Sequence, residues 1–233
     1  MLPIAILAGG FGTRLGKLSL DIPKCLIPIN KRPFVDWQLD LLQEAGYKKV
    51  VFCLSHKSEQ VQEHLGDGSK YGLNIEYSLD GEKQLGTGGA VKRAIPQLGE
   101  HFAVTYGDSF LPIIFQGVEE RVLRNNPVAL MTVYENKNQL DKSNVEFKNG
   151  KIIEYKKNSD NPSMHHIDYG LMYFHASVFE AFSPNEAFDL GEVCSALSKS
   201  GNMAAFEVKD RFYEIGSPRG IEELSNFLRK EKP

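Results

Sequence analysis

The order of apolar and amphipathic segments limits the fold of this 233-residue chain more than any other feature. Short apolar segments with the composition of strands alternate with segments whose apolar residues recur at helical spacing. This alternation is typical of an α/β protein with a largely parallel sheet, because each helix carries the chain back to the edge where the next strand begins. The expected strands are residues 3–8, 49–54, 74–78, 102–106 and 128–134, and the expected helices are residues 33–45, 58–65, 89–95 and 118–124.

The pattern changes after about residue 140. The segment "VEFKNGKIIEY" predicts two short strands that turn at Asn149-Gly150, a dipeptide typical of tight β-hairpins. Because no repeat or linker separates the two parts, we expect one domain over residues 1–233, with one half at residues 1–135 and the other at residues 136–233. The remaining expected elements are a strand at 166–175, a helix at 190–199, a strand at 204–208 and a helix at 220–230.

Composition and charge exclude several classes of function. The chain has 27 Lys and Arg against 30 Asp and Glu, so it carries no basic footprint for nucleic acid or for an anionic membrane surface. No apolar run reaches the ~20 residues that span a bilayer, and the apolar start at residues 1–8 is too short for a signal peptide. The three cysteines, Cys25, Cys53 and Cys194, have neither disulfide nor metal-site spacing, so we expect reduced thiols and a cytoplasmic protein.

The first expected strand runs directly into a glycine-rich loop, "LAGGFGTRL". Gly9, Gly10 and Gly12, together with Thr13, offer bare backbone N–H groups at the carboxyl end of the strand, where ligands bind in open parallel sheets. Such a nest suits phosphate, and the Arg14 guanidinium adds a fork that can hold two phosphate oxygens. A tight strand-to-helix turn with an exposed arginine is the alternative interpretation.

Two common phosphate-binding motifs are excluded. A P-loop needs a Lys-Ser or Lys-Thr pair after its second glycine, whereas this loop has Thr13-Arg14. A dinucleotide-binding fingerprint needs a third glycine at the position of Leu15. The loop therefore belongs to another class of phosphate site, if it binds phosphate at all.

A second segment, "DIPKCLIPI", places Lys24 between Pro23 and an apolar run, from where it can bring a positive charge back to the glycine loop. Together, "LAGGFGTRL" and "PKCLIPI" resemble the two-part motif of the sugar-1-phosphate nucleotidyltransferases, also called NDP-sugar pyrophosphorylases. That motif reads L-A-G-G-x-G-[ST]-R-L and then P-K-[PAC]-L-[VIL]-P. The chain looks most similar to short bacterial members such as heptose-1-phosphate guanylyltransferases and N-acetylmuramate-1-phosphate uridylyltransferases.

The resemblance implies a three-layer, Rossmann-like (GT-A-like) α/β fold with a mixed, mostly parallel sheet. Residues 1–135 would form the nucleotide-binding half, and residues 136–233, with the inserted hairpin, the sugar-phosphate-binding half. The implied reaction transfers a nucleotidyl group from an NTP to a sugar 1-phosphate by in-line attack on the α-phosphorus, with release of pyrophosphate. Mg²⁺ is the implied cofactor, the NTP and the sugar 1-phosphate are the implied partners, and a monomer or homodimer is expected.

The resemblance also implies roles for single residues. Arg14 holds the leaving pyrophosphate, Lys24 neutralises the α-phosphate, and Asp108, in "VTYGDSF", binds Mg²⁺ from a strand end. Glu214, in "FYEIGSP", stands where many relatives have a second metal-binding Asp. The implied nucleotide contacts are Leu7, Ala8, Gly9, Gly10, Gly12, Thr13, Arg14, Lys24, Gly86, Thr87 and Gly88, and the implied sugar contacts are Glu154, Asp168 and Gly170.

Two other functions are compatible with this pattern. One is a cytidylyltransferase that acts on a non-sugar phosphate, and the other is a pyrophosphorylase-like nucleotide sensor without turnover. A silent sensor would be expected to lose Arg14, Lys24 or Asp108, and the presence of all three favours an enzyme. The sequence leaves the base open, with a preference for GTP or CTP from the resemblance, and it does not decide whether Lys156 or Lys157 meets the acceptor phosphate.

Overall fold

The computed structural model describes residues 1–10, 22–183 and 187–231. Gly12, Thr13 and Arg14, all predicted to bind phosphate, lie outside the described residues. Within the described ranges, the central sheet has nine strands. Four of them run parallel in the order β6-β1-β4-β5: β1 (Ile4–Leu7), β4 (Lys49–Leu54), β5 (Asn74–Leu79) and β6 (His101–Tyr106).

The sheet continues beyond β6 through one long antiparallel strand. Strand β11 (His166–His175) pairs with β6 on one side and with β8 (Ala129–Glu135) on the other, and both pairings are antiparallel. Strand β12 (Ala204–Val208) then pairs parallel to β8. Most strands therefore point the same way, which confirms the expected mixed, mostly parallel sheet.

The predicted hairpin is present beside the N-terminal end of β11. Strands β9 (Val145–Lys148) and β10 (Lys151–Tyr155) pair antiparallel, and His166 of β11 pairs with Val145. The turn residues Asn149 and Gly150 have φ angles of 52° and 77°. Positive φ at both positions matches the right-handed twist of the strands and is the reason that Asn-Gly favours this turn.

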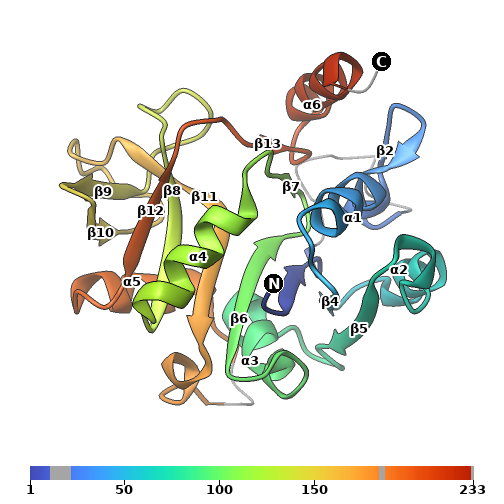
Figure 1. Ribbon diagram of the computed structural model, residues 1–233, viewed down its shortest axis with the longest axis horizontal. Helices are drawn as coiled ribbons and strands as arrows, with labels where there is room; N and C mark the ends of the chain where they lie inside the picture. Colours follow the sequence, from blue (N-terminus) through green and yellow to red (C-terminus); the bar gives the residue numbers. More distant parts are fainter. Residues whose placement is uncertain (11–21, 184–186, 232–233) are drawn as a thin grey trace.

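Helices cover both faces of the sheet because the side chains of each strand alternate between the faces. Ile4 and Ile6 of β1 pack in one core with α1 (Phe34–Glu44), α2 (Ser58–Leu65) and α4 (Phe115–Asn125). Ala5, between them, packs in a second core with α3 (Gly86–Leu98) and α5 (Leu190–Lys199). Figure 1 shows α1 and α4 in front of the sheet and α3 and α5 behind it. The three-layer α/β architecture expected from the sequence is therefore confirmed.

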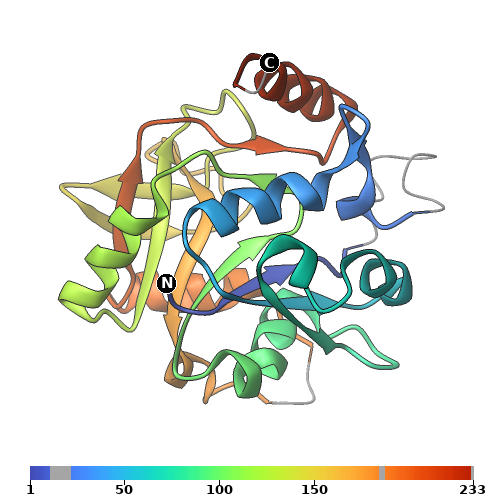
Figure 2. The same cartoon turned by 45° about the vertical axis from the view of Figure 1, so that its right-hand side comes forward.

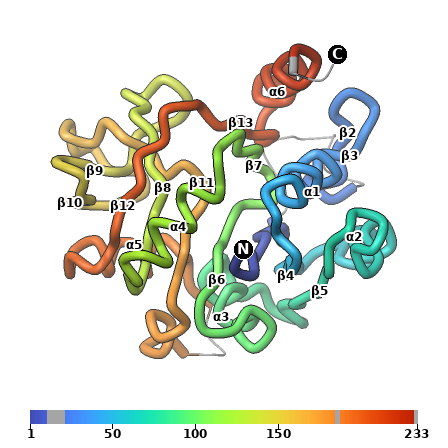
Figure 3. Tube along the Cα trace, in the orientation of Figure 1, coloured from blue at the N-terminus to red at the C-terminus, as the bar shows by residue number. Residues whose placement is uncertain are grey.

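The last part of the chain returns to the first part. In Figure 3 the trace passes from the blue and green half to the yellow and orange half, and the final helix, α6 (Pro218–Glu231), comes back beside the blue segment. Figure 2 shows α6 close to the blue β2 segment. There α6 packs in a third core that includes Ile29 and Phe34. This return pairs β13 (Tyr213–Glu214) with β7 (Ser109–Phe110), which directly follows Asp108.

Several elements differ from the sequence expectation. The paired strands β2 (Pro28–Ile29) and β3 (Arg32–Pro33), like β7 and β13, have two residues each, which is too short for an alternating pattern to register. Helix α3 begins three residues earlier than expected, and its glycine-rich first turn is held where the N–H groups of Gly88 and Gly89 donate to the Phe188 carbonyl. The remaining short elements are the 3₁₀ helices η2 (Lys24–Leu26), η3 (Ser69–Tyr71) and η4 (Ala176–Phe179).

The cysteines and the helices bear on two predictions made for the whole chain, reduced thiols and the lack of a membrane span. All three cysteines are buried free thiols, so the described fold contains no disulfide between them. Among the described helices, none combines the length and the apolar composition needed to cross a membrane.

Candidate functional site

A cavity of about 300 Å³ lies where β1 and β6 end and α3 begins. Open parallel sheets bind ligands at this edge, because the loops after neighbouring strands diverge there and leave a crevice. Eight residues predicted from the sequence line it, and they come from four separate segments of the chain. They are Leu7, Ala8, Gly9, Gly10, Lys24, Gly86, Thr87 and Asp108.

The first glycines are placed by close packing between strand ends. A Cβ on Gly9 would lie 2.9 Å from Ser55 Oγ, and this hydroxyl donates a hydrogen bond to the Gly9 carbonyl at 2.5 Å. A Cβ on Gly107 would lie 2.7 Å from the Cβ of Ala8. Gly10 is different, because among the described residues a Cβ there would meet nothing within 4 Å. The backbone of Gly9 and Gly107 is thus fixed by its neighbours, while no described residue outside the local chain crowds Gly10.

A lysine and an aspartate from separate segments of the cavity lining meet in an ion pair. Lys24 Nζ, at the start of η2, donates to Asp108 Oδ2, just after β6. Both side chains keep contact with solvent, with 14% of Lys24 and 28% of Asp108 exposed. Cys25 anchors the short helix η2 beneath Lys24, and burial raises the pKa of its thiol to about 12. At neutral pH Cys25 is therefore a neutral packing residue, although it lines the cavity.

The turn that carries Asp108 is held by one buried amide. Gln38 of α1 is 3% exposed, and its Nε2 donates to the Tyr106 carbonyl at 2.8 Å and to the Ser109 carbonyl at 2.9 Å. From the other side, the Ile215 N–H donates to the Asp108 carbonyl at 3.0 Å. Residues bound on both sides in this way lose little further freedom when a ligand arrives, so the carboxylate is preorganised.

The second glycine cluster divides into two parts. Gly86 and Thr87 line the cavity, and Thr87 Oγ1 also accepts the Leu190 N–H at 2.8 Å. Gly88 has a packing role, because a Cβ there would lie 2.4 Å from the Phe188 ring. The absence of a side chain at Gly88 thus allows α3 to pack against the Phe188 segment.

The residues predicted to contact sugar do not all lie together. Asp168 and Gly170 of β11 lie beside Tyr106, which itself lines the cavity. Tyr106 Oη donates to Asp168 Oδ2 at 3.1 Å, and the Gly170 N–H donates to Asp168 Oδ1 at 2.9 Å. Glu154 lies on the hairpin, where its Oε2 accepts from Asn161 Nδ2 at 3.3 Å. The geometry thus connects Asp168 and Gly170 to the cavity through Tyr106.

The two carboxylates predicted to bind metal line different cavities. Asp108 lines the first cavity, whereas Glu214 lines a second one of about 260 Å³ together with Arg211 and Glu223. The strand register places Glu214 opposite Ser109. A partly exposed carboxylate beside a phosphate-sized cavity fits Mg²⁺, which takes one or two carboxylates and completes its octahedron with phosphate oxygens and water. Both Asp108 and Glu214 are partly exposed, but only Asp108 shares its cavity with Lys24 and the Gly9-Gly10 backbone.

Several residues that line the first cavity could not be, or were not, predicted from the sequence. Asp80 follows the end of β5, and Gln84 precedes α3. Burial raises the pKa of Asp80, whose Oδ2 accepts the Leu85 N–H at 3.2 Å. Asp80 could have been predicted from the sequence, because like Asp108 it is an acidic residue just after an expected strand. Tyr106 reads only as the last residue of a buried strand, so its contact with Asp168 could not be predicted.

The pKa of Asp168 gives a stability prediction. Burial raises this pKa from 3.8 to about 6. The folded state therefore holds the proton more tightly than the unfolded state, and the stability gained from it is complete below pH 3.8 and lost as the pH rises through about 6. At pH 7 we expect Asp168→Asn to raise the free energy of unfolding by about 1–2 kcal/mol, after allowance for partial exposure.

Urea unfolding at pH 4 and pH 7 measures this effect. Asp160→Asn is a matched control, because the Asp160 side chain is 97% exposed and no gain is expected there. An Asp168→Asn variant that is less stable than the wild type at pH 7 would contradict the prediction.

Comparisons with known proteins place this α/β fold and its cavity in a family. A family model described as Nucleotidyl transferase matches residues 4–231. One relative is D-glycero-alpha-D-manno-heptose 1-phosphate guanylyltransferase of Campylobacter jejuni, which is 30% identical over 226 residues, 96% of this chain and 97% of that protein. N-acetylmuramate alpha-1-phosphate uridylyltransferase of Neisseria meningitidis is 38% identical over 111 residues, 47% of this chain and 48% of that protein.

A solved structure shares the fold. HddC from Yersinia pseudotuberculosis, in complex with GMP-PN, matches with a TM-score of 0.82 at 23% identity, over 98% of this chain and 100% of that one. The chain belongs to the nucleotidyl transferase family. It is a nucleotidyltransferase, and the resemblance drawn from its two-part motif is confirmed.

Proposed function

We propose that this enzyme transfers a nucleotidyl group from an NTP to a sugar 1-phosphate and releases pyrophosphate. The observation that carries the proposal is that Lys24 and Asp108 form an ion pair on the lining of a cavity that the Gly9-Gly10 backbone also lines. The attacking sugar phosphate is already an anion, so the reaction needs no general base. The barrier is electrostatic, because two anions approach and charge builds on the leaving pyrophosphate. A cation, a carboxylate that can hold a metal, and bare backbone suit that barrier.

In this proposal each side chain has a separate task. Lys24 lies against the α-phosphate and offsets its charge, while the loop at Gly9 and Gly10 leaves room for the triphosphate. Asp108 holds Mg²⁺, which when bound supplies charge neutralisation of the phosphate oxygens. Lys24 and Asp108 pair with each other in the structure described here, so substrate binding replaces that contact by contacts to phosphate and metal. Gly12 and Thr13 are proposed to cradle the triphosphate with Gly9 and Gly10, and Arg14 is proposed to hold the leaving pyrophosphate.

The acceptor is proposed to lie on the β11 side of the cavity. Tyr106 extends from the lining to Asp168, so a sugar ring placed there meets a carboxylate acceptor and the space left by Gly170. Glu154, Lys156 and Lys157 lie on or after the hairpin strand β10. Lys157 pairs with Asp189 at 2.7 Å and its charge also acts on Asp168, whereas the charge of Lys156 acts on the exposed Asp160, so Lys157 is our first choice for the acceptor phosphate.

The wider setting also follows from the proposal. We propose one domain over residues 1–233, since strands of both halves join in one sheet. We propose a cytoplasmic enzyme, because the NTP substrates occur there and the three thiols are free. It would act as a monomer or homodimer.

The test is an assay of four NTPs against a panel of sugar 1-phosphates, with pyrophosphate release as the signal. GTP with a heptose 1-phosphate is the first pair to test, because the Campylobacter jejuni relative carries both in its name. We expect one NDP-sugar and one pyrophosphate per turnover, and loss of activity with a chelator. NTP hydrolysis without an NDP-sugar, across the whole panel, would count against the proposal.

A further inference from the structure

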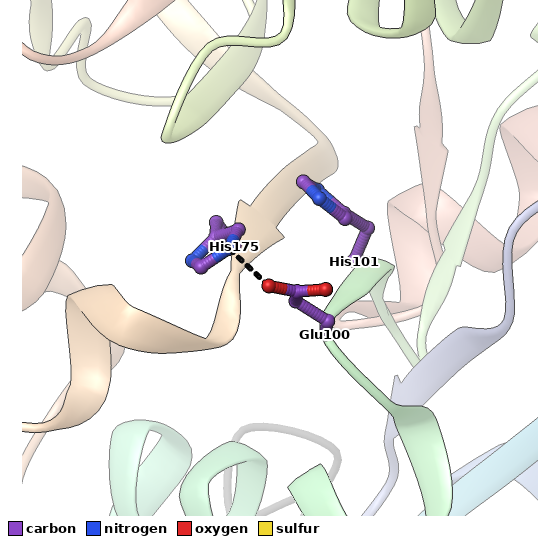
Figure 4. A group of neighbouring side chains, drawn as sticks. All are labelled: Glu100, His101 and His175. Carbon is purple, nitrogen blue, oxygen red and sulfur yellow. Dashed lines mark hydrogen bonds and ion pairs between the residues drawn. The ribbon is translucent and has the colours of Figure 1, made fainter.

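Two histidines and a glutamate gather at the far end of strand β6 from Asp108. Glu100 and His101 stand at the start of β6, and His175 ends the neighbouring strand β11 (Figure 4). Because β6 has six residues, this cluster lies roughly 17 Å along the strand from Tyr106 and the nucleotide cavity. The proposed transfer reaction makes no use of it.

The sheet register holds the three side chains together. His101 and His175 are directly paired across the antiparallel strands, and their ring centroids are 4.7 Å apart. Glu100 joins them because its carbonyl accepts the Ala176 N–H at 2.8 Å, which fixes the backbone on both strands. One ligand atom from each of the three residues lies within 4.8 Å of the other two. A metal ion needs only small rotations of these side chains to bind all three.

The cluster is accessible from solvent. The Glu100 side chain is 73% exposed and that of His175 is 27% exposed. The Glu100 Oε1 atom lies 3.0 Å from His175 Nε2, which is the side of the ring that faces the cluster. An ion can therefore enter without any opening of the sheet.

We propose that Glu100, His101 and His175 bind one late first-row divalent cation, with Zn²⁺ as the best fit. Two imidazoles and one carboxylate are a ligand set that Zn²⁺ takes in a tetrahedral site, with water or another ligand in the fourth position. Mg²⁺ prefers oxygen ligands, so the cation proposed for Asp108 would not compete well here. The site is thus chemically distinct from the nucleotide cavity.

A hydroxyl beside His175 supports the required protonation state. When Nε2 binds a metal, the proton of the neutral imidazole is on Nδ1, and this proton needs an acceptor. Ser177 Oγ lies 2.7 Å from Nδ1 and can accept it. In the structure Nδ1 also accepts the Ser177 N–H at 3.1 Å. Metal binding at Nε2 would keep the contact between Nδ1 and Ser177 Oγ, with Nδ1 as the donor, and would give up the contact with the Ser177 N–H.

Titration of the metal-free protein with Co²⁺ and Zn²⁺ tests the site. We expect one Co²⁺ per chain with the visible absorption of tetrahedral coordination, displaced by one Zn²⁺, and a rise in Tm with Zn²⁺. His101→Gln and His175→Gln should each weaken binding by at least about 10-fold. Glu100→Gln is a milder variant, because its exposed side chain can change without disturbing the sheet, and weaker binding is expected there too.

His165→Gln is the matched control, since His165 is exposed and belongs to a separate part of the chain. It should bind Co²⁺ like the wild type. Unchanged binding in the three cluster variants would overturn the proposal, because the ion would then be held elsewhere. Absence of saturable one-to-one binding by the wild type would overturn it as well.

Discussion

Replacing Lys24 by alanine is expected to lower the turnover rate by about 100- to 1,000-fold, the usual cost of removing one preorganised charge or donor from a transition state. The loss follows from geometry, because Lys24 Nζ contacts Asp108 and Lys24 is the one Lys or Arg among the described residues that line the cavity. The loss should appear in kcat, because the contact of Lys24 with the phosphates strengthens as negative charge builds up in the transition state. Pyrophosphate release at saturating NTP measures it.

The fold should survive this change. The short helix η2 is anchored by the buried Cys25 and Ile27, not by the lysine that precedes them. Lys48→Ala is the matched control, because Lys48 is exposed and lies just before β4, at the opposite end from the cavity. Near-wild-type turnover by Lys24→Ala, with a normal melting curve, would remove Lys24 from the mechanism.

Asp108→Asn is expected to reduce turnover by a similar factor, about 100- to 1,000-fold, and to change the response to Mg²⁺. Asparagine has nearly the same shape, so the contacts of the Gln38 amide to the Tyr106 and Ser109 carbonyls should persist. What is lost is the negative charge that would hold the metal. The variant should need far more Mg²⁺ for its residual activity than the wild type does.

Asp160→Asn serves as the control for Asp108, because it removes one exposed carboxylate from the segment between β10 and β11. Glu214→Gln, measured in the same Mg²⁺ titration, decides whether the second predicted ligand contributes from its separate cavity. An Asp108→Asn enzyme with the Mg²⁺ requirement of the wild type would show that the metal is held by other residues.

Periodicity was sufficient to predict the layers of the fold. The alternation of Ile4, Ala5 and Ile6 between two cores is the physical content of the strand prediction, and the Asn149-Gly150 turn has the positive φ values that its sequence favours. The predicted helix at residues 190–199 has the bounds of α5. Periodicity fails for β7 and β13, because two-residue strands exist only through their partner, which lies about a hundred residues away in the sequence.

The candidate site was predictable only in part, for a related reason. The sequence motifs predicted Gly9, Lys24 and Asp108 as site residues, and these residues line one cavity. Gln38 could not be found in this way, because in the sequence it is one of several polar residues on an amphipathic helix and its two acceptors lie some seventy residues later. Gly88 shows the opposite case, where a glycine inside a binding motif is required by the Phe188 ring.

A crystal structure with an NTP analogue and Mg²⁺ tests the central claim most directly. The account predicts a triphosphate in the cavity between Gly10 and Lys24, with the metal on Asp108 and the Lys24–Asp108 ion pair replaced by contacts to phosphate and metal. A nucleotide bound in another cavity, or a triphosphate whose phosphates contact neither Lys24 nor a metal on Asp108, would contradict it.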